Sequence, residues 1–244
     1  MDVLPVLDLL NGVVVRGVGG KRETYRPIES RICPSSEPLA VARAFRDQFG
    51  LERLYVADLD AILEHRPNLD VYRRLTQEGF TLLVDAGIRY PEEAANVLQT
   101  GAQAVIAGLE SIPQADLLST LVSELGSQRV IFSLDLQHGR PLSGNAAWLG
   151  MTPLNIADAA IRQGVKRLIV LDLGQVGIGE GISTLELCAS IRSQHPHVEL
   201  ITGGGVRHRS DLQLLANSHV DGVLIASALH NGQLSRGDLQ DLLY

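Results

Sequence analysis

Cysteine and aromatic residues are scarce in this sequence of 244 residues. Aromatic side chains make up 4% of the chain, with a single tryptophan, and the two cysteines are Cys33 and Cys188. Two such distant cysteines exclude a disulfide framework, and neither they nor the seven histidines show the spacing of a metal site. We therefore expect no bound metal, and a reducing cytoplasm as the compartment.

Long apolar runs and excess positive charge are also absent. No run approaches the roughly 20 apolar residues that a membrane-spanning helix needs, and the first residues read as a strand rather than a signal peptide. Net charge is −7 and the pI about 5.5, which argues against nucleic acid or an anionic membrane as the main partner. A small anionic substrate stays compatible, because glycine turns bind phosphate locally.

Apolar runs rich in Val, Ile and Leu alternate with helix-like stretches along the whole chain. The expected strands are 3–8, 53–58, 81–85, 103–107, 129–135, 166–172, 197–202 and 221–226. The expected helices are 37–49, 68–78, 91–99, 113–124, 153–163, 181–194, 208–217 and 235–243. Strands apolar on consecutive positions are typical of a parallel sheet covered on both faces. Strict alternation predicts one α/β domain over residues 1–244, a (β/α)8 TIM barrel, with an open doubly wound sheet as the competitor.

Near-copies of several segments recur about half the chain apart, and they favour the closed barrel. Val6–Gly12 resembles Ser133–Gly139, each an apolar run that ends in aspartate and meets a polar residue and glycine. Three further pairs recur in the same order: Leu54–Leu59 with Leu168–Leu173, Val84–Arg89 with Thr202–Arg207, and Ala104–Gly108 with Gly222–Ala226. These repeats predict two half-barrels, about 1–126 and 127–244.

Aspartates stand at the expected carboxyl ends of several strands. Asp8 and Asp135 end the first and fifth strands, which lie on opposite sides of an eight-stranded barrel. Two such carboxyl groups can act as acid and base if their surroundings separate their pKa values, so we expect this pair to be catalytic. Asp58 and Asp172 end the second and sixth strands. Each of these two is expected either to position residues of the site without contacting the ligand or to cap its own turn.

Glycine-rich turns follow the seventh and eighth strands. Gly203, Gly204 and Gly205 come after the seventh, and Ala226 and Ser227 after the eighth. The loops at these places are the recurrent phosphate site of TIM barrels, because backbone N–H groups can approach an anion there. We therefore predict phosphate binding at this side of the barrel, against the alternative of a tight structural turn.

Two loop features are ambiguous from sequence alone. The loop after the first strand, about 11–37, contains the basic segment Gly19–Pro27, which is either a lid over the site or a solvated loop. Trp148 lies in the loop after the fifth strand, within 143–150. It is expected either to stack on a planar ligand or to pack under its own loop.

These motifs together resemble the histidine-biosynthesis barrels, namely the ribotide aldose–ketose isomerase and the cyclase subunit of imidazole glycerol phosphate synthase. The resemblance extends over nearly the whole chain. It implies that Asp8 and Asp135 perform the acid–base chemistry of an Amadori rearrangement on a phosphorylated substrate, without metal or organic cofactor. It also implies that Trp148 stacks on the substrate, as a tryptophan of the same loop does in some isomerases.

The chain departs from that pattern after the sixth strand. The isomerases carry a Thr-Asp-Ile-x-x-Asp-Gly-Thr type of segment there, and this chain has Leu171, Val176 and Ile178 at the first, sixth and last of those positions. Two hydroxyls and a carboxylate of the family pattern are therefore replaced by aliphatic groups. The loop after the second strand, Asp58–Ile62, lacks the usual glycine.

A second departure affects the phosphate grip of the first half. Gly87, Arg89 and Gly108 are retained, but Asp85 stands where a glycine is expected. A carboxylate roughly 5 Å from a phosphate charge would cost about 3 kcal/mol per unit charge at an effective dielectric near 20. We therefore predict one tightly held phosphate, at the turns after the seventh and eighth strands. The place after the third strand is expected to be empty or to hold a non-phosphate group, with Asp85 either turned away in a supporting role or bound to a hydroxyl or amine.

These departures resemble a divergent branch of the isomerase relatives that occurs in organisms using methanopterin-type one-carbon carriers. The leading hypothesis is a sugar-phosphate isomerase-like enzyme acting on a phosphorylated, ribosyl-containing intermediate of methanopterin-type cofactor assembly. One alternative is a cyclase or lyase that uses the same aspartates and is fed by a protein partner that the sequence does not identify. The other is a non-catalytic phosphometabolite-binding barrel.

Overall fold

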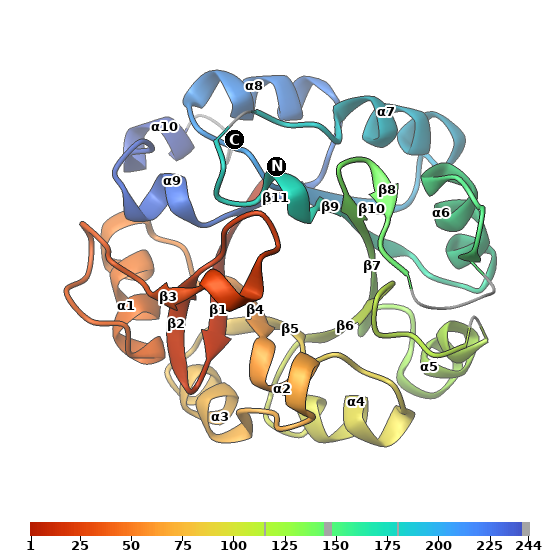
Figure 1. Ribbon diagram of the computed structural model, residues 1–244, viewed down its shortest axis with the longest axis horizontal. Coiled ribbons are helices and arrows are strands. Elements are labelled where there is room, and N and C mark those ends of the chain that lie inside the picture. The colour runs from red at the N-terminus through yellow and green to blue at the C-terminus, as the bar shows by residue number, and fades with distance from the viewer. Residues whose placement is uncertain (115, 144–147, 180, 241–244) are drawn as a thin grey trace.

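Eight parallel strands close into a barrel in the computed structural model, which describes residues 1–114, 116–143, 148–179 and 181–240 (Figure 1). In order around the barrel they are β1 (Asp2–Leu10), β4 (Arg53–Asp58), β5 (Thr81–Asp85), β6 (Ala104–Gly108), β7 (Val130–Gln137), β9 (Arg167–Asp172), β10 (Glu199–Gly203) and β11 (Gly222–Ile225). The ring closes where Asp2 to Pro5 pair in parallel with Gly222 to Ile225. The predicted TIM barrel is confirmed, and the open sheet is excluded by this closing pair.

Helices surround the barrel on the outside, as Figure 1 shows. The helices that alternate with the strands are α1 (Pro38–Phe49), α3 (Leu69–Gln77), α4 (Pro91–Leu98), α5 (Leu117–Leu125), α6 (Pro153–Arg162), α7 (Leu185–Gln194), α8 (Arg209–Asn217) and α10 (Arg236–Gln240). Short helices add to the carboxyl-end loops: η1 (Arg22–Thr24), α2 (Leu59–Glu64), η3 (Leu173–Gln175) and α9 (Ser227–His230). Proline opens α1, α4 and α6, where its missing N–H and fixed φ suit the first helical turn.

Two expected helices begin later than the sequence predicts. The helix expected over 181–194 begins at Leu185 as α7. The helix expected over 113–124 begins at Leu117 as α5. The chain first makes a turn in which the carbonyl of Gly108 accepts hydrogen bonds from the amides of Ser111 (2.9 Å) and Ile112 (3.0 Å). This turn holds the segment that follows β6 against the mouth of the barrel.

The interior of the barrel is filled by aliphatic side chains, so the strands form a packed core rather than a pore. This inner cluster includes Leu4, Leu83, Ile106, Ile131, Ile169 and Ile201. A larger apolar layer lies between the strands and the helices. Because the core fills the barrel below its mouth, space for a ligand remains at the carboxyl ends of the strands.

Three short antiparallel strands extend the sheet at the mouth: β2 (Val13–Arg16), β3 (Arg26–Pro27) and β8 (Arg140–Pro141). They form similar hairpins on β1 and β7, whose turns are Asn11–Gly12 and His138–Gly139 with φ between 51° and 75° at all four residues. Asp60 accepts both amides of the first turn, at 2.8 and 3.2 Å. Asp172 accepts both amides of the second, at 2.9 and 2.8 Å. The matched hairpins agree with the predicted half-barrel repeat, which stays a prediction.

Candidate functional site

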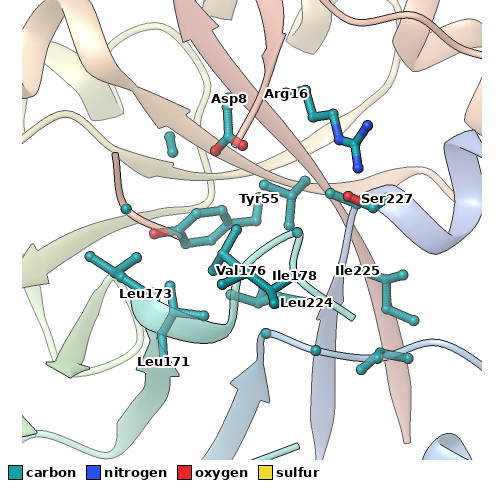
Figure 2. Close-up of a pocket in the computed structure, with 18 of the residues that line it drawn as sticks. Asp8, Arg16, Tyr55, Leu171, Leu173, Val176, Ile178, Leu224, Ile225 and Ser227 are labelled. Carbon is teal, nitrogen blue, oxygen red and sulfur yellow. The ribbon is translucent and has the colours of Figure 1, made fainter. Parts of the chain in front are cut away.

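A cavity of about 510 Å³ opens at the carboxyl ends of the barrel strands. Its wall takes residues from strands on every side of the mouth and from the loops after β1, β6, β9, β10 and β11. Figure 2 shows this pocket with Asp8, Tyr55 and Ser227 around it. The cavity lies where TIM barrels build their active sites.

Asp8 and Asp135 both line this cavity. Their strands, β1 and β7, are separated by three barrel strands in either direction. Burial raises the pKa of Asp8 to about 7, and a hydrogen bond from the backbone of Gly17 offsets part of the rise. Burial raises the pKa of Asp135 well above its ordinary value, and the negative charges of Asp85 and Glu110 raise it further. The structure thus brings together two carboxyl groups of different acidity.

Asp85 is a third carboxyl group of the cavity, at the end of β5. It accepts hydrogen bonds from the amide of Gly87 (3.0 Å) and from the hydroxyl of Tyr55 (3.3 Å), and burial raises its pKa to about 6. Gly108 lies between two of these carboxylates, because a Cβ atom there would be 3.2 Å from Asp135 Oδ2 and 3.8 Å from Asp85 Oδ2. A glycine is therefore needed on β6 to keep this part of the mouth open.

The other residues expected to grip phosphate in the first half do not line the cavity. The Arg89 guanidinium donates to the carbonyls of Gly87 (2.7 Å) and Ile62 (2.8 Å), which joins the loops after β4 and β5. Gly87 has a φ of 61°, and a Cβ there would lie 2.9 Å from the Cα of Ile62. Both residues shape the loop, while Asp85 occupies the wall of the cavity.

The glycine turns after β10 and β11 do reach the cavity. Gly204, Gly205, Ala226 and Ser227 line it, and Gly203 instead lies at the end of β10, where a Cβ would be 2.7 Å from that of Leu224. Gly204 and Gly205 have φ values of 85° and 81°. A side chain at Gly205 would also collide with the carbonyl of Gly181. Glycine is thus required by the backbone itself, and the same geometry leaves the turn open to a ligand.

Asp58 and Asp172 lie outside the cavity wall and organise loops. The fully buried Asp58 carboxylate accepts hydrogen bonds from the amide of Ala61, from the amide and side chain of Asn68, and from the hydroxyl of Tyr72. Asp172 accepts from the hairpin turn on β7 and from the amide of Gly174 at 3.0 Å. Their positions support the structural alternative that the sequence left open for them.

Trp148 is buried, with 3% of its surface exposed, and does not line the cavity. Its ring packs on Phe132 of β7 with 6.2 Å between the ring centroids. Residues 144–147 of its loop lie outside the described residues. The structure therefore places Trp148 against β7 and outside the cavity wall, which does not agree with stacking on a ligand.

Arg16, Arg22, Tyr25 and Glu110 all line the cavity. Arg22 and Tyr25 belong to the basic segment Gly19–Pro27, whereas Arg16 and Glu110 belong to no motif of the sequence that points to chemistry. Arg16 follows Val15, the antiparallel partner of Asp8, and Figure 2 shows its side chain directed toward Ser227. Among the described residues, no side chain pairs with the Arg16 guanidinium. The sequence signal that predicts this placement is Asn11–Gly12 between two apolar runs, which is typical of a two-residue hairpin.

The segment after β9 forms an aliphatic wall of the cavity. Leu171, Leu173, Val176 and Ile178 all line it, and Figure 2 shows them together on one side. This wall lies between the carboxylates and the glycine turns. It offers a substrate apolar contact where two hydroxyls and a carboxylate were expected from the family resemblance.

Within the described residues, no cluster of three His, Cys, Asp or Glu side chains is placed to hold a metal ion. No described helix is both long and apolar enough to cross a bilayer.

Residues 2–235 match the protein family described as histidine biosynthesis protein. An uncharacterized protein of Methanocaldococcus jannaschii is 31% identical over 248 residues, covering 100% of this chain and 98% of the relative. A 1-(5-phosphoribosyl)-5-((5-phosphoribosylamino)methylideneamino) imidazole-4-carboxamide isomerase of Listeria monocytogenes is 31% identical over 247 residues, covering 99% and 98%. The isomerase of the same name from Lactococcus lactis is 30% identical over 244 residues, covering 96% and 94%.

Proposed function

Because the chain belongs to the histidine biosynthesis protein family, we propose that it is an aldose–ketose isomerase of the Amadori type that acts on a phosphorylated, ribosyl-containing substrate. The observation that carries this proposal is the shared cavity of Asp8 and Asp135, which end strands on opposite sides of the barrel. The relatives named as isomerases match over nearly their whole length. A binding barrel without chemistry has no need for two such carboxyl groups.

The surroundings of the two aspartates support different roles. Burial and the negative charges of Asp85 and Glu110 raise the pKa of Asp135 well above its usual value, which favours its protonated form. It is therefore the general acid, which protonates the ring oxygen of the aminoaldose as the ring opens. Asp8, with a pKa of about 7, is ionised in a large fraction of molecules and is the general base. It removes the proton from C2, and reprotonation of the resulting enolamine gives the ketose.

The phosphate of the substrate belongs at the turns after β10 and β11. The turn formed by Gly204 and Gly205 and the start of α9 at Ser227 line the same cavity as the aspartates. The Arg16 guanidinium, which has no side-chain partner among the described residues, points toward Ser227 and supplies positive charge on this side (Figure 2). Backbone amides and an arginine are the groups that bind phosphate most directly.

The reaction that we propose is not that of the histidine pathway. Leu171 and Val176 place aliphatic groups on the cavity wall where the family pattern has a hydroxyl and a carboxylate, and Asp85 replaces a glycine of the phosphate grip. We place the substrate instead in methanopterin-type cofactor biosynthesis. A cyclase or lyase reaction with the same pair of aspartates is the second candidate, because ring closure also requires proton transfer on both faces of the substrate.

Assays with N-substituted 5-phosphoribosylamines, followed by nuclear magnetic resonance, test this proposal. We expect conversion of the aldose into the 1-amino-1-deoxyketose by the wild-type protein and no conversion by Asp8→Asn. Expression in a histidine auxotroph that lacks the isomerase is expected to give no growth without histidine. Growth at ordinary expression levels would show that the histidine-pathway reaction has been retained.

A further inference from the structure

The charges of the cavity are divided between its two ends. Carboxyl groups from β5, β7 and the turn after β6 gather on the side of the barrel opposite β10 and β11: Asp85, Asp135 and Glu110. Arg16, Arg207 and the glycine turns lie at the other. A substrate that spans the cavity therefore meets opposite electrostatic fields at its two ends.

A cationic group of the protein itself already lies in the acidic end. Arg22 of η1 extends from the loop after β1, and its guanidinium forms an ion pair with Glu110 in the turn after β6. Both side chains are mostly covered, with 25% and 22% of their surfaces exposed. Burial raises the pKa values of Asp8, Asp85 and Asp135, and the positive charge of Arg22 offsets part of that rise in all three. One guanidinium thus interacts with four carboxyl groups.

The acidic end still has capacity for a hydrogen-bond donor. Asp135 is 5% exposed, and only its Oδ1 atom accepts a hydrogen bond among the described residues, from Ser133 at 2.6 Å. Its Oδ2 atom lies beside Gly108 on the wall of the cavity. Buried carboxyl oxygens are normally hydrogen-bonded, so this oxygen is open to a hydrogen bond with a ligand.

We propose that the acidic end receives a cationic nitrogen group of the substrate, an ammonium, amidinium or guanidinium, and that Arg22 occupies this place until the substrate displaces it. The inference rests on the proposed function for the position of the phosphate, at the glycine turns. The substrate is then a zwitterion, with phosphate at one end and basic nitrogen at the other. Arg22 and Glu110 select for it, because a second phosphate would meet the carboxyl groups of Asp85, Asp135 and Glu110.

A matched pair of synthetic probes tests the inference by calorimetry at neutral pH. 5-Aminopentyl phosphate and hexyl phosphate have the same length and differ in a terminal ammonium against a methyl group. We expect the ammonium probe to bind the wild-type protein about 10-fold more tightly, since one charge-assisted contact of roughly 1.4 kcal/mol gives that ratio. Glu110→Gln should remove most of the difference and leave the affinity for hexyl phosphate unchanged.

Replacing Arg22 tests whether the ammonium probe displaces this arginine or is only attracted to the carboxyl groups. Arg22→Ala should bind the ammonium probe more tightly than the wild-type protein does, because the probe no longer competes with the arginine. Arg26→Ala is the matched control: Arg26 lies in the same loop and is exposed, and its guanidinium donates to the carbonyls of Glu23 and Tyr25. It should leave both affinities unchanged. Weaker binding of the ammonium probe to Arg22→Ala than to the wild-type protein would overturn the displacement.

Two further probes distinguish this inference from the proposed function. If pentane-1,5-diyl bisphosphate binds more tightly than hexyl phosphate, and Arg22→Ala abolishes that gain, Arg22 is an anion ligand and the inference is wrong. If neither inorganic phosphate nor hexyl phosphate binds, the proposed phosphate position is wrong. Propylguanidinium then decides the inference alone: it should bind Arg22→Ala, and the additional change Glu110→Gln should abolish that binding.

Discussion

Burial controls the acidity of individual carboxyl groups at the mouth of this barrel. Burial is the main cause of the raised pKa values of Asp8, Asp85 and Asp135. Hydrogen bonds from Gly17, Tyr55 and Ser133, respectively, lower these pKa values in part. Raised pKa values are useful in proton transfer because acid and base then exchange protons near neutral pH. They also make the folded state less stable when the groups ionise.

Asp8→Asn and Asp135→Asn should each lower kcat by about 10²–10⁴-fold, because each removes one proton-transfer group. The double variant should lose far less than the product of the two effects, since the pair acts as a unit. Circular dichroism and the affinity for inorganic phosphate should stay close to those of the wild-type protein. Full turnover by Asp8→Asn would eliminate the acid–base assignment.

Asp8→Asn should also change how stability depends on pH. The folded-state pKa of Asp8 is raised from 3.8 to about 7, so its protonated form favours folding. This contribution is fully present below the unfolded-state pKa and is lost as pH rises through about 7. Asparagine does not ionise, so the variant should have a higher Tm than the wild-type protein at pH 8 and lose that advantage toward pH 4. An equal difference in Tm at both values would contradict the buried, ionising Asp8.

At the scale of elements, aspartates hold the loops that carry the site. Asp58 joins the end of β4 to α2 and α3 through four hydrogen bonds, and Asp60 and Asp172 hold the two hairpin turns. The contacts of Asp60 fix the hairpin on β1 that carries Arg16 into the cavity. The site therefore depends on carboxylates that do not touch it.

Asp58→Ala should destabilise the protein by about 3 kcal/mol or more, because it leaves buried donors of Asn68 and Tyr72 unpaired. Turnover per folded molecule should remain within about threefold of the wild-type value, as Asp58 is not part of the cavity wall. Urea unfolding and active-site-normalised kinetics measure the two effects separately. A loss of kcat near that of Asp8→Asn in a fully folded protein would instead give Asp58 a catalytic role.

Sequence pattern predicts the barrel elements well, because parallel buried strands are continuous apolar runs and proline marks several helix starts. It predicts Asp8, Asp135, Gly204 and Ser227 at one cavity, because strand ends of a barrel meet at one rim. The ion pair of Arg22 with Glu110 cannot be predicted from sequence pattern, because it joins two loops that are far apart in sequence and meet only in the folded protein. The burial of Trp148 also depends on tertiary packing, against Phe132.

At the scale of the whole molecule, the barrel brings the two halves of the sequence to one cavity with unequal ends. Closure between β11 and β1 places the glycine turns of the second half beside Arg16 of the first. The equivalent position of the first half carries Asp85 instead of glycine. The family resemblance is confirmed by the matches over the whole chain. We expect the unequal ends of the cavity to disfavour a substrate that carries a phosphate at each end.

A crystal grown in phosphate or sulfate should contain one tightly held anion, at the turns after β10 and β11. The turn after β5 should contain none, because the Asp85 carboxylate faces the cavity there and accepts its hydrogen bonds from Gly87 and Tyr55. The electron density for the anion can be compared directly at the two places in the same crystal. Equal anion density at both, with Asp85 unmoved, would show that the substrate carries two phosphates.

The central claim is that Asp8 and Asp135 move protons within one substrate molecule. Capture of a ligand from a metabolite extract by Asp8→Asn, followed by its release and treatment with the wild-type protein, tests this claim most directly. The account predicts a product with a new retention time and an unchanged mass, bearing one phosphate. A product of altered mass would identify a cyclase or lyase, and an unchanged ligand would contradict catalysis by this pair of aspartates.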